Sequence, residues 1–282
     1  MGMTRPSIRP QGPPLPIKGD LRLPTALSLL VVGVMAVASL AGWFFSSALY
    51  PTEEALQSFA ANDIVNLFIG VPILLGSMAL ARRGKLIGLL FWPGGLLYPL
   101  YNYLAYLVGV PIGWPSLAYL ALILASLIAL ILLLGGMDAG AIQARLQGAV
   151  HERLGGGALA VFGVFVVLRD LGVLVSAQTD PSVNLALELP VLVADFVLSV
   201  VWIGVGVQLW RRRALGYTLG AGLLFQASML FVGLIAYFLL QPGLTGAPLP
   251  VVDILVVAGM GLLCFIPLAL FTRGVIHREH RL

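Results

Sequence analysis

The chain has 282 residues, of which 60% are hydrophobic, 10% charged and 9% aromatic, and its formal net charge is +4. Soluble domains are about 45–50% apolar and about 25% charged, so these few charges could not coat a soluble globule of this size. The apolar excess falls in long blocks. This composition excludes a soluble enzyme, a secreted disulfide scaffold and a disordered chain, and it predicts a polytopic membrane protein.

Eight apolar blocks are long enough to cross a bilayer, whose hydrocarbon core of about 30 Å needs roughly 20 helical residues. The connections between them are short and leave no room for a separate soluble domain. The predicted fold class is therefore all-α, a polytopic membrane helical bundle with eight transmembrane helices. The predicted spans are 25–49, 61–81, 86–110, 116–135, 158–177, 188–209, 215–240 and 251–272.

The basic residues predict how these spans are oriented, because Lys and Arg gather in cytoplasmic segments. All of them except Arg169 fall on one side of the membrane, in segments 5–22, 82–85, 145–153, 211–213 and 273–281. The four opposite connections, around 50–60, 111–115, 178–187 and 241–250, contain none. Both termini are therefore predicted to be cytoplasmic, in a multi-pass protein of the cell (plasma or inner) membrane.

Five parts of the chain are expected from the same pattern. They are a flexible, Pro-rich cytoplasmic segment (1–24), a first membrane half (25–136), a cytoplasmic amphipathic linker (137–157), a second membrane half (158–272) and a basic cytoplasmic tail (273–282). In the linker, Ile142, Leu146, Val150 and Leu154 recur every four residues. That spacing predicts a helix lying on the inner leaflet, with a solvated helical linker as the alternative.

The two membrane halves resemble each other weakly, which predicts a 4+4 parallel repeat. Segment 80–98 (LARRGKLIGLLFWPGGLLY) and segment 209–226 (LWRRRALGYTLGAGLLFQ) each place an Arg pair before a Gly-containing apolar span. A shift of 129 residues between the halves places Asn66 over Asp195. The alternative is a chance likeness, since apolar helices with basic inner ends look alike.

Polar and ionisable residues inside a membrane are costly and are functional candidates by default. Here they gather in the outer half of the spans, which predicts an acidic cavity that opens outward. Pro93 and Pro99 further predict a kinked or locally unwound third span, a feature that lines binding sites in some transporters. The candidate substrate-binding residues are Asp63, Asn66, Tyr98, Tyr101, Asn102, Arg169, Asp170, Glu188 and Asp195.

Arg169 is predicted to organise this polar site, because it is the one basic residue that the cytoplasmic segments do not contain. A guanidinium near mid-membrane needs a carboxylate within hydrogen-bonding reach. Asp195 matches its depth best, followed by Asp63 and Asp170. Asp170 points about 100° away around the helix and is expected to need another partner or a proton. The alternative is a purely structural ion-pair network that locks helices together.

Three functions are consistent with this pattern. The first is binding or transport of a small polar or cationic solute in the outward-facing cavity. The second is a membrane-embedded enzyme acting on a lipid or isoprenoid, with Asp170 or Asp195 as the catalytic acid and Tyr98 and Tyr101 lining an aromatic pocket. The third is a non-catalytic membrane subunit or scaffold whose polar residues only pack.

The sequence lacks the residues that several membrane-protein chemistries require. Lys18 and Lys85 are the only lysines and neither is mid-span, which excludes a retinal Schiff base. All three histidines lie in cytoplasmic segments, so transmembrane haem or His-ligated metal is not expected. The single cysteine, Cys264, excludes a dithiol site. No cofactor, metal or nucleic acid is expected; the expected partners are the lipid bilayer and a small solute or lipid ligand, and the oligomeric state is open.

The stretch NDIVNLFIGVPILLGSMALARRG followed by LLYPLYNYLAYLVG resembles a family of prokaryotic multispanning membrane proteins with about eight spans. The resembling features are Asp63, Pro72, the Arg82–Arg83 pair and the aromatic cluster from Tyr98 to Tyr106. The resemblance covers the second and third spans best. It implies a membrane bundle and carries no activity.

Overall fold

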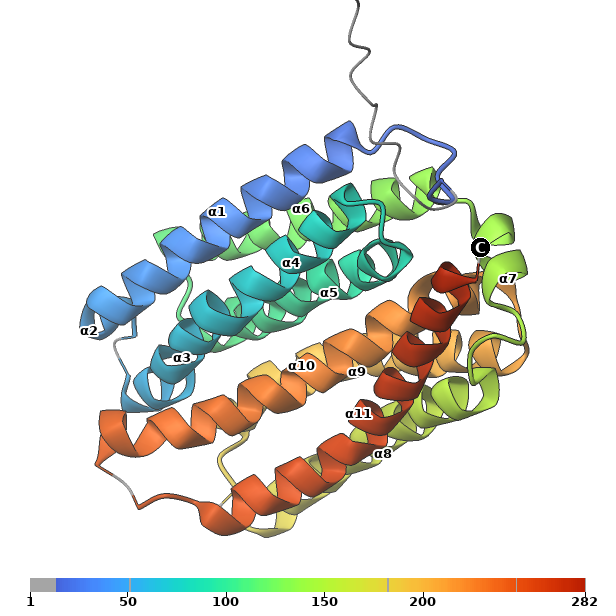
Figure 1. Cartoon of the computed structure of the whole chain (residues 1–282). Helices are drawn as coiled ribbons and strands as arrows, with labels where there is room; N and C mark the ends of the chain where they lie inside the picture. Colours follow the sequence, from blue (N-terminus) through green and yellow to red (C-terminus); the bar gives the residue numbers. More distant parts are fainter. Residues whose placement is uncertain (1–13, 51, 182, 247, 282) are drawn as a thin grey trace, which may run out of the picture.

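The computed structural model describes residues 14–50, 52–181, 183–246 and 248–281 (Figure 1). In this part of the chain the regular elements are helical, apart from one isolated bridge between Ile17 and Met137. The all-α prediction is therefore confirmed. The elements are α1 (Arg22–Phe44), α2 (Ser46–Leu49), α3 (Glu53–Val65), η1 (Asn66–Gly70), α4 (Val71–Arg82), α5 (Leu86–Gly109), α6 (Trp114–Gly136), α7 (Ala139–Leu146), α8 (Glu152–Thr179), α9 (Leu185–Trp210), α10 (Ala214–Thr245) and α11 (Val251–His280).

Seven helical segments in the described residues are long and apolar enough to cross a membrane. They are α1, the continuous run from Phe59 through η1 and α4, and α6, α8, α9, α10 and α11. Large apolar side chains such as Leu117, Leu168 and Leu255 are more than half exposed on these helices. In a bilayer such residues face lipid at no cost, so the chain is a multi-pass helical membrane protein.

The predicted span that does not meet this criterion is α5, a helix of 24 residues. It mixes Trp, Tyr, Asn and Pro with its apolar residues and is buried along most of its length. Helices α4, α6, α9 and α10 pack around it. A helix covered by protein along most of its length does not need lipid-soluble side chains, so its Tyr, Trp, Asn and Pro residues are tolerated there.

The expected local unwinding of this span is wrong, because α5 runs as one α-helix through Pro93 and Pro99; the alternative expectation, a kink at the prolines, stays a prediction. The irregular backbone lies in the preceding span, where the five residues of η1 form a π-helical turn between α3 and α4. Such single turns of wider helix occur frequently at functional sites.

Helix α5 contacts α10 at two glycines. A Cβ at Gly94 would overlap the backbone of Gly222, and a Cβ at Gly222 would lie 2.8 Å from the carbonyl oxygen of Leu90. Small residues at a crossing let two membrane helices approach closely. These two glycines therefore allow the close approach of α5 and α10.

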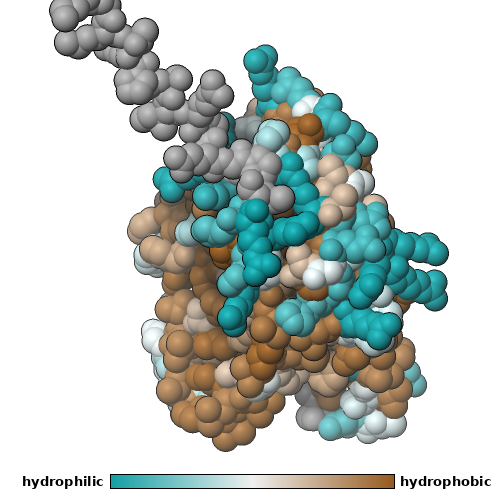
Figure 2. Space-filling view, turned by 45° about the vertical axis from the view of Figure 1, so that its right-hand side comes forward, coloured by the Kyte–Doolittle hydropathy of each residue, from teal (hydrophilic) through white to brown (hydrophobic). Residues whose placement is uncertain are grey.

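Both described ends of the chain lie at the same end of the bundle, next to α7 (Figure 1). The Arg145 guanidinium donates to the Pro14 carbonyl at 2.6 Å, and Arg278 Nε donates to the Arg145 carbonyl at 3.2 Å. Hydrophilic side chains gather at this end, above a largely hydrophobic body (Figure 2). We call it the basic end, since the segments 82–85, 145–153, 211–213 and 273–281 lie there.

Segment 137–157, predicted to be an amphipathic helix on the inner leaflet, has a different structure. Helix α7 ends at Leu146, and Gly148 adopts a positive φ of 75° before α8 begins. Ile142, Leu146 and Val150 are buried in the protein core rather than turned to a leaflet. Leu154 is 43% exposed and belongs to α8. The four-residue spacing therefore marked a face that packs against α10 and α11, not a membrane surface.

The N-terminal segment 1–24 is predicted to be flexible, but its described residues, 14–24, are bonded to the rest of the protein or lie in α1. Lys18 and Gly19 donate backbone hydrogen bonds to the Gly136 carbonyl, and Asp138 donates one to the Pro16 carbonyl. Helix α1 then begins at Arg22. Residues 14–21 are thus held against the junction of α6 and α7, and the rest of the predicted segment, 1–13, lies outside the described residues.

Candidate functional site

The predicted polar site is built where α8 and α9 pack together. Gly156, Gly163 and Asp170 recur every seven residues on α8 and are all buried. A Cβ at Gly156 would meet the Gly206 carbonyl at 2.5 Å, and one at Gly163 would meet the Ser199 carbonyl at 3.0 Å. This contact line brings the two backbones close and carries Asp170 into the interface with α9.

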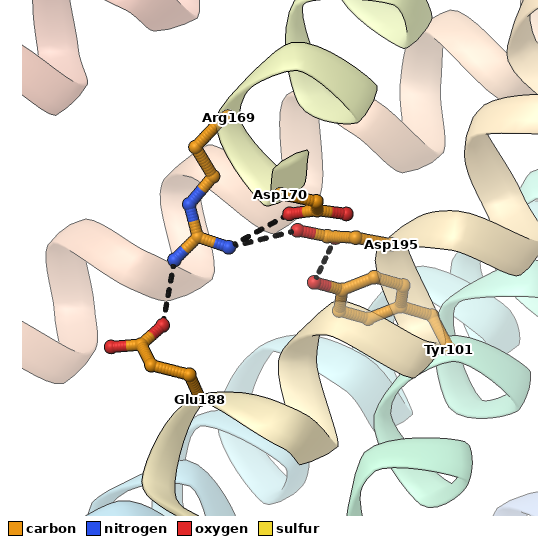
Figure 3. Close-up of polar contacts among 5 residues, drawn as sticks. All are labelled: Tyr101, Arg169, Asp170, Glu188 and Asp195. Carbon is orange, nitrogen blue, oxygen red and sulfur yellow. Dashed lines mark hydrogen bonds and ion pairs between the residues drawn. The ribbon is translucent and has the colours of Figure 1, made fainter. Parts of the chain in front are cut away.

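Arg169 lies beside that interface and contacts three carboxylates (Figure 3). Its Nη1 is 3.1 Å from Asp170 Oδ1 and 3.5 Å from Asp195 Oδ2, and its Nη2 is 3.1 Å from Glu188 Oε2. Tyr101 on α5 donates its hydroxyl to Asp195 Oδ1 at 2.7 Å. We call these five residues the Arg169 cluster.

The cluster is buried on one side and open on the other. The side chains of Arg169 and Glu188 are 39% and 38% exposed, whereas Asp170 and Asp195 are buried. Asp170 Oδ2 is buried and has no hydrogen-bond partner. One guanidinium therefore faces three carboxylates, and one buried carboxylate oxygen remains free to accept a hydrogen bond.

The expectation that a carboxylate lies within reach of the Arg169 guanidinium is confirmed. The expectation that Asp170 could not share this partner is wrong: the long Arg169 side chain reaches around its own helix to it. Pairing between Arg169 and Asp63 is also wrong, because Asp63 lies in a different cluster.

Asp63 is 1% exposed and is surrounded by tyrosines. Its Oδ2 accepts a hydrogen bond from Tyr50 at 2.5 Å, and its Oδ1 accepts one from Tyr106 at 2.9 Å. Tyr103 and Tyr119 pack their rings against Tyr106. Burial, followed by the neighbouring Asp63 carboxylate, raises the pKa of Tyr50 well above its usual value, so this hydroxyl stays a donor. We call these residues the Asp63 cluster.

Two further predicted residues are the buried amides Asn102, on α5, and Asn66, in η1. Asn102 accepts from the Asn62 side chain at 3.2 Å and donates to the Tyr98 carbonyl at 3.0 Å. Asn66, in η1, is fully buried, and neither atom of its amide has a partner. Helix α5 therefore lies between the two clusters. Its Tyr101 side chain bonds Asp195 in the Arg169 cluster, whereas Tyr98 and Asn102 lie on a different face, toward the Asp63 cluster.

Sequence reasoning missed two residues that complete the Asp63 cluster and a third, Glu279, that joins α11 to α5 outside both clusters. Tyr50 and Tyr106 hold Asp63, and Glu279 Oε1 accepts from the Leu86 backbone amide at the start of α5, at 2.6 Å. The spacing of Tyr98, Asn102 and Tyr106 at intervals of four could have grouped them on one helix face. Nothing local indicates Tyr50 or Glu279, whose partners are 13 and 193 residues away.

Comparison with protein-family models, with curated proteins and with solved structures finds no match for this chain. The resemblance to a prokaryotic multispanning family therefore stays a prediction. In the described residues no group of three or more His, Cys, Asp or Glu is arranged to hold a metal ion.

Proposed function

We propose that the chain binds, and transports, a small organic cation at the Arg169 cluster. The observation that carries this proposal is the imbalance of charge around one partly open site. A single guanidinium faces Asp170, Glu188 and Asp195, and the buried Asp170 Oδ2 lacks a partner. A protonated amine could donate to that oxygen and offset the excess negative charge, because buried carboxylates need paired donors.

The position of the cluster supports a route into it from one face. Arg169 and Glu188 are the exposed members and would meet the solute first. Asp195 lies deeper, held by the Tyr101 hydroxyl from the central helix α5. A solute that displaced Arg169 from Asp195 would loosen the contact between α8, α9 and α5, which is the kind of coupling that a transport cycle requires.

The test is solute binding to the purified protein, measured by thermal shift and calorimetry with protonated amines and with neutral analogues of the same shape. Asp170→Asn and Asp195→Asn should each weaken amine binding about tenfold, the equivalent of one charge-assisted hydrogen bond. The control is Asp253→Asn, which removes an exposed carboxylate at the start of α11 outside the cluster.

An equal loss in Asp253→Asn, or equal binding of the neutral analogues, would contradict the proposal. Full binding in both cluster variants, with unchanged unfolding temperature, would do so as well. Uptake into liposomes separates transport from binding alone. A chemical change in an added isoprenoid or lipid would favour the enzymatic alternative, in which Asp170 or Asp195 acts as the acid.

We propose further that the chain crosses the membrane eight times, with α5 as the additional span and both termini in the cytoplasm. Seven crossings would leave the two chain ends on opposite sides, yet Pro14 and Arg278 both contact Arg145. An even number of crossings is needed, and α5, with 24 residues, is long enough to supply one. The basic end would then be cytoplasmic by the distribution of Lys and Arg.

The packing also supports the proposed 4+4 repeat. If the halves correspond, α1, α3–α4, α5 and α6 match α8, α9, α10 and α11. The contacting pairs then occur twice: α5 with α6 and α10 with α11, α1 with α6 and α8 with α11, α4 with α5 and α9 with α10. The central pair, α5 with α10, crosses at Gly94 and Gly222, where a pseudo-twofold axis would lie.

A further inference from the structure

A groove of about 480 Å³ lies between α5, α10 and α11 on a face that the Arg169 cluster does not use. Phe91 of α5 and Phe225 of α10 stack in parallel on one wall, with ring centroids 4.4 Å apart and planes 1° from parallel. Met229, Phe265 and Leu268 continue the lining. Its volume falls in the range of pockets that hold small molecules.

The polar groups of this groove are confined to one end. Thr272, Arg273 and His277 line it on the last turns of α11, and the α11 residues that line it before them are apolar. Arg273 and His277 are four residues apart, so they share a helix face. The groove is thus apolar along its length and positively charged where α11 approaches the basic end.

Arg273 has no ion pair among the described residues. Arg212, also at the basic end, lies 3.9 Å from Glu152, whereas Arg273 is the arginine that lines the groove. His277 Nδ1 donates to the Arg273 carbonyl at 2.9 Å, and Nε2 can donate to a phosphate when the ring is doubly protonated. Arg273 is exposed at the mouth of this apolar groove, so its guanidinium can pair with an anion from outside the protein.

We propose that this groove binds an anionic phospholipid of the inner leaflet, with its phosphate on Arg273 and His277 and an acyl chain against Phe91 and Phe225. A free phosphate would leave the apolar wall uncovered, and a zwitterionic lipid would offer Arg273 no net negative charge. Basic pockets between transmembrane helices on the cytoplasmic side are suited to anionic headgroups. The occupant would tie α11 to the central helices α5 and α10.

The experiment is native mass spectrometry of the full chain taken from nanodiscs of phosphatidylcholine with or without phosphatidylglycerol. The wild type should retain phosphatidylglycerol in preference to phosphatidylcholine. Arg273→Gln should reduce that preference about fivefold, the contribution of one basic residue near the membrane surface. The matched control is Arg83→Gln, which removes one exposed charge at the end of α4, outside the groove.

A second variant tests the apolar part of the groove. Ala269→Trp places a large side chain in its lining and should displace the lipid whatever its headgroup, and the exposure of Ala269 leaves room for the variant to fold. Equal loss in Arg83→Gln and Arg273→Gln would overturn the proposal, as would equal retention of both lipids by the wild type. Complete displacement by inorganic phosphate, or unchanged lipid retention in Ala269→Trp, would overturn it too.

Discussion

Arg169 has the largest number of charged partners of any residue in the described chain, yet its side chain is 39% exposed. Its removal would leave Asp170 and Asp195 buried without a counter-charge. Arg169→Ala should therefore lower the free energy of unfolding by about 1–3 kcal/mol, the cost of unpaired buried polar groups. Chemical or thermal unfolding in detergent measures it.

The double variant Arg169→Leu with Asp195→Leu distinguishes a structural role from a functional one. It removes a buried charge together with its partner and should recover part of the lost stability, as apolar replacements of buried ion pairs do. Amine binding should stay lost. Recovery of both stability and binding would show that the ion pair only holds helices together. Glu188→Gln, on the exposed side of the cluster, should lower the free energy of unfolding less than Arg169→Ala does.

At the scale of the element, α1 approaches α3 at Gly42. A Cβ there would overlap the Asp63 carboxylate and lie 2.7 Å from the Tyr50 hydroxyl. Gly42→Ala should therefore displace Asp63 and destabilise the protein by about 1–3 kcal/mol, the usual cost of overpacking. The control is Gly33→Ala on the same helix, where a Cβ would meet nothing within 4 Å.

Because alanine favours helix over glycine, Gly33→Ala should leave the unfolding temperature unchanged or raise it slightly. Equal effects of the two substitutions would mean that the close approach of α1 to the Asp63 cluster does not limit stability. The comparison needs no assumption about function, since both variants remove only a glycine from α1.

Helix α11 is joined to the start of α5 by Glu279. Its carboxylate accepts from the Leu86 amide, a donor that has no partner within α5 because it lies in the first turn. Glu279→Ala should cost about 0.5–2 kcal/mol, as for loss of other helix caps. Glu279→Gln keeps an acceptor oxygen and should lose less of the free energy of unfolding. Thermal unfolding of the three proteins compares them, and a loss as large in Glu279→Gln would show that charge, not capping, matters.

The sequence predicted features that depend on contact with lipid better than features that depend on which helices touch. The spans and Arg169 were predictable because lipid imposes a simple rule on every residue that faces it. The linker was misread because a four-residue spacing identifies a buried face but not what covers it: Ile142 and Leu146 face protein. Asp63 was separated from Arg169 by the position of α5, and a linear sequence does not say which helix lies in the middle.

At the scale of the whole molecule, the position of α5 decides the topology. If α5 crosses the membrane, the turn at Lys85 and the turn at Ile112 lie on opposite sides; if it does not, they lie on the same side. Both positions are exposed, and Ile112 is 95% exposed. The only native cysteine, Cys264, is fully buried and can be replaced by Ala to give a background without thiols.

Single cysteines at these two positions, Lys85→Cys and Ile112→Cys, should therefore react differently with a membrane-impermeant maleimide. In intact cells Ile112→Cys should be labelled, whereas Lys85→Cys should be labelled only after the membrane is permeabilised. Gln178→Cys and His280→Cys, at the ends of α8 and α11, serve as outer and inner references. Labelling of Lys85→Cys and Ile112→Cys from the same side would show that α5 does not cross. The contacts of Pro14 and Arg278 with Arg145 would then require a second helix to be re-entrant, because both chain ends meet at one end of the bundle.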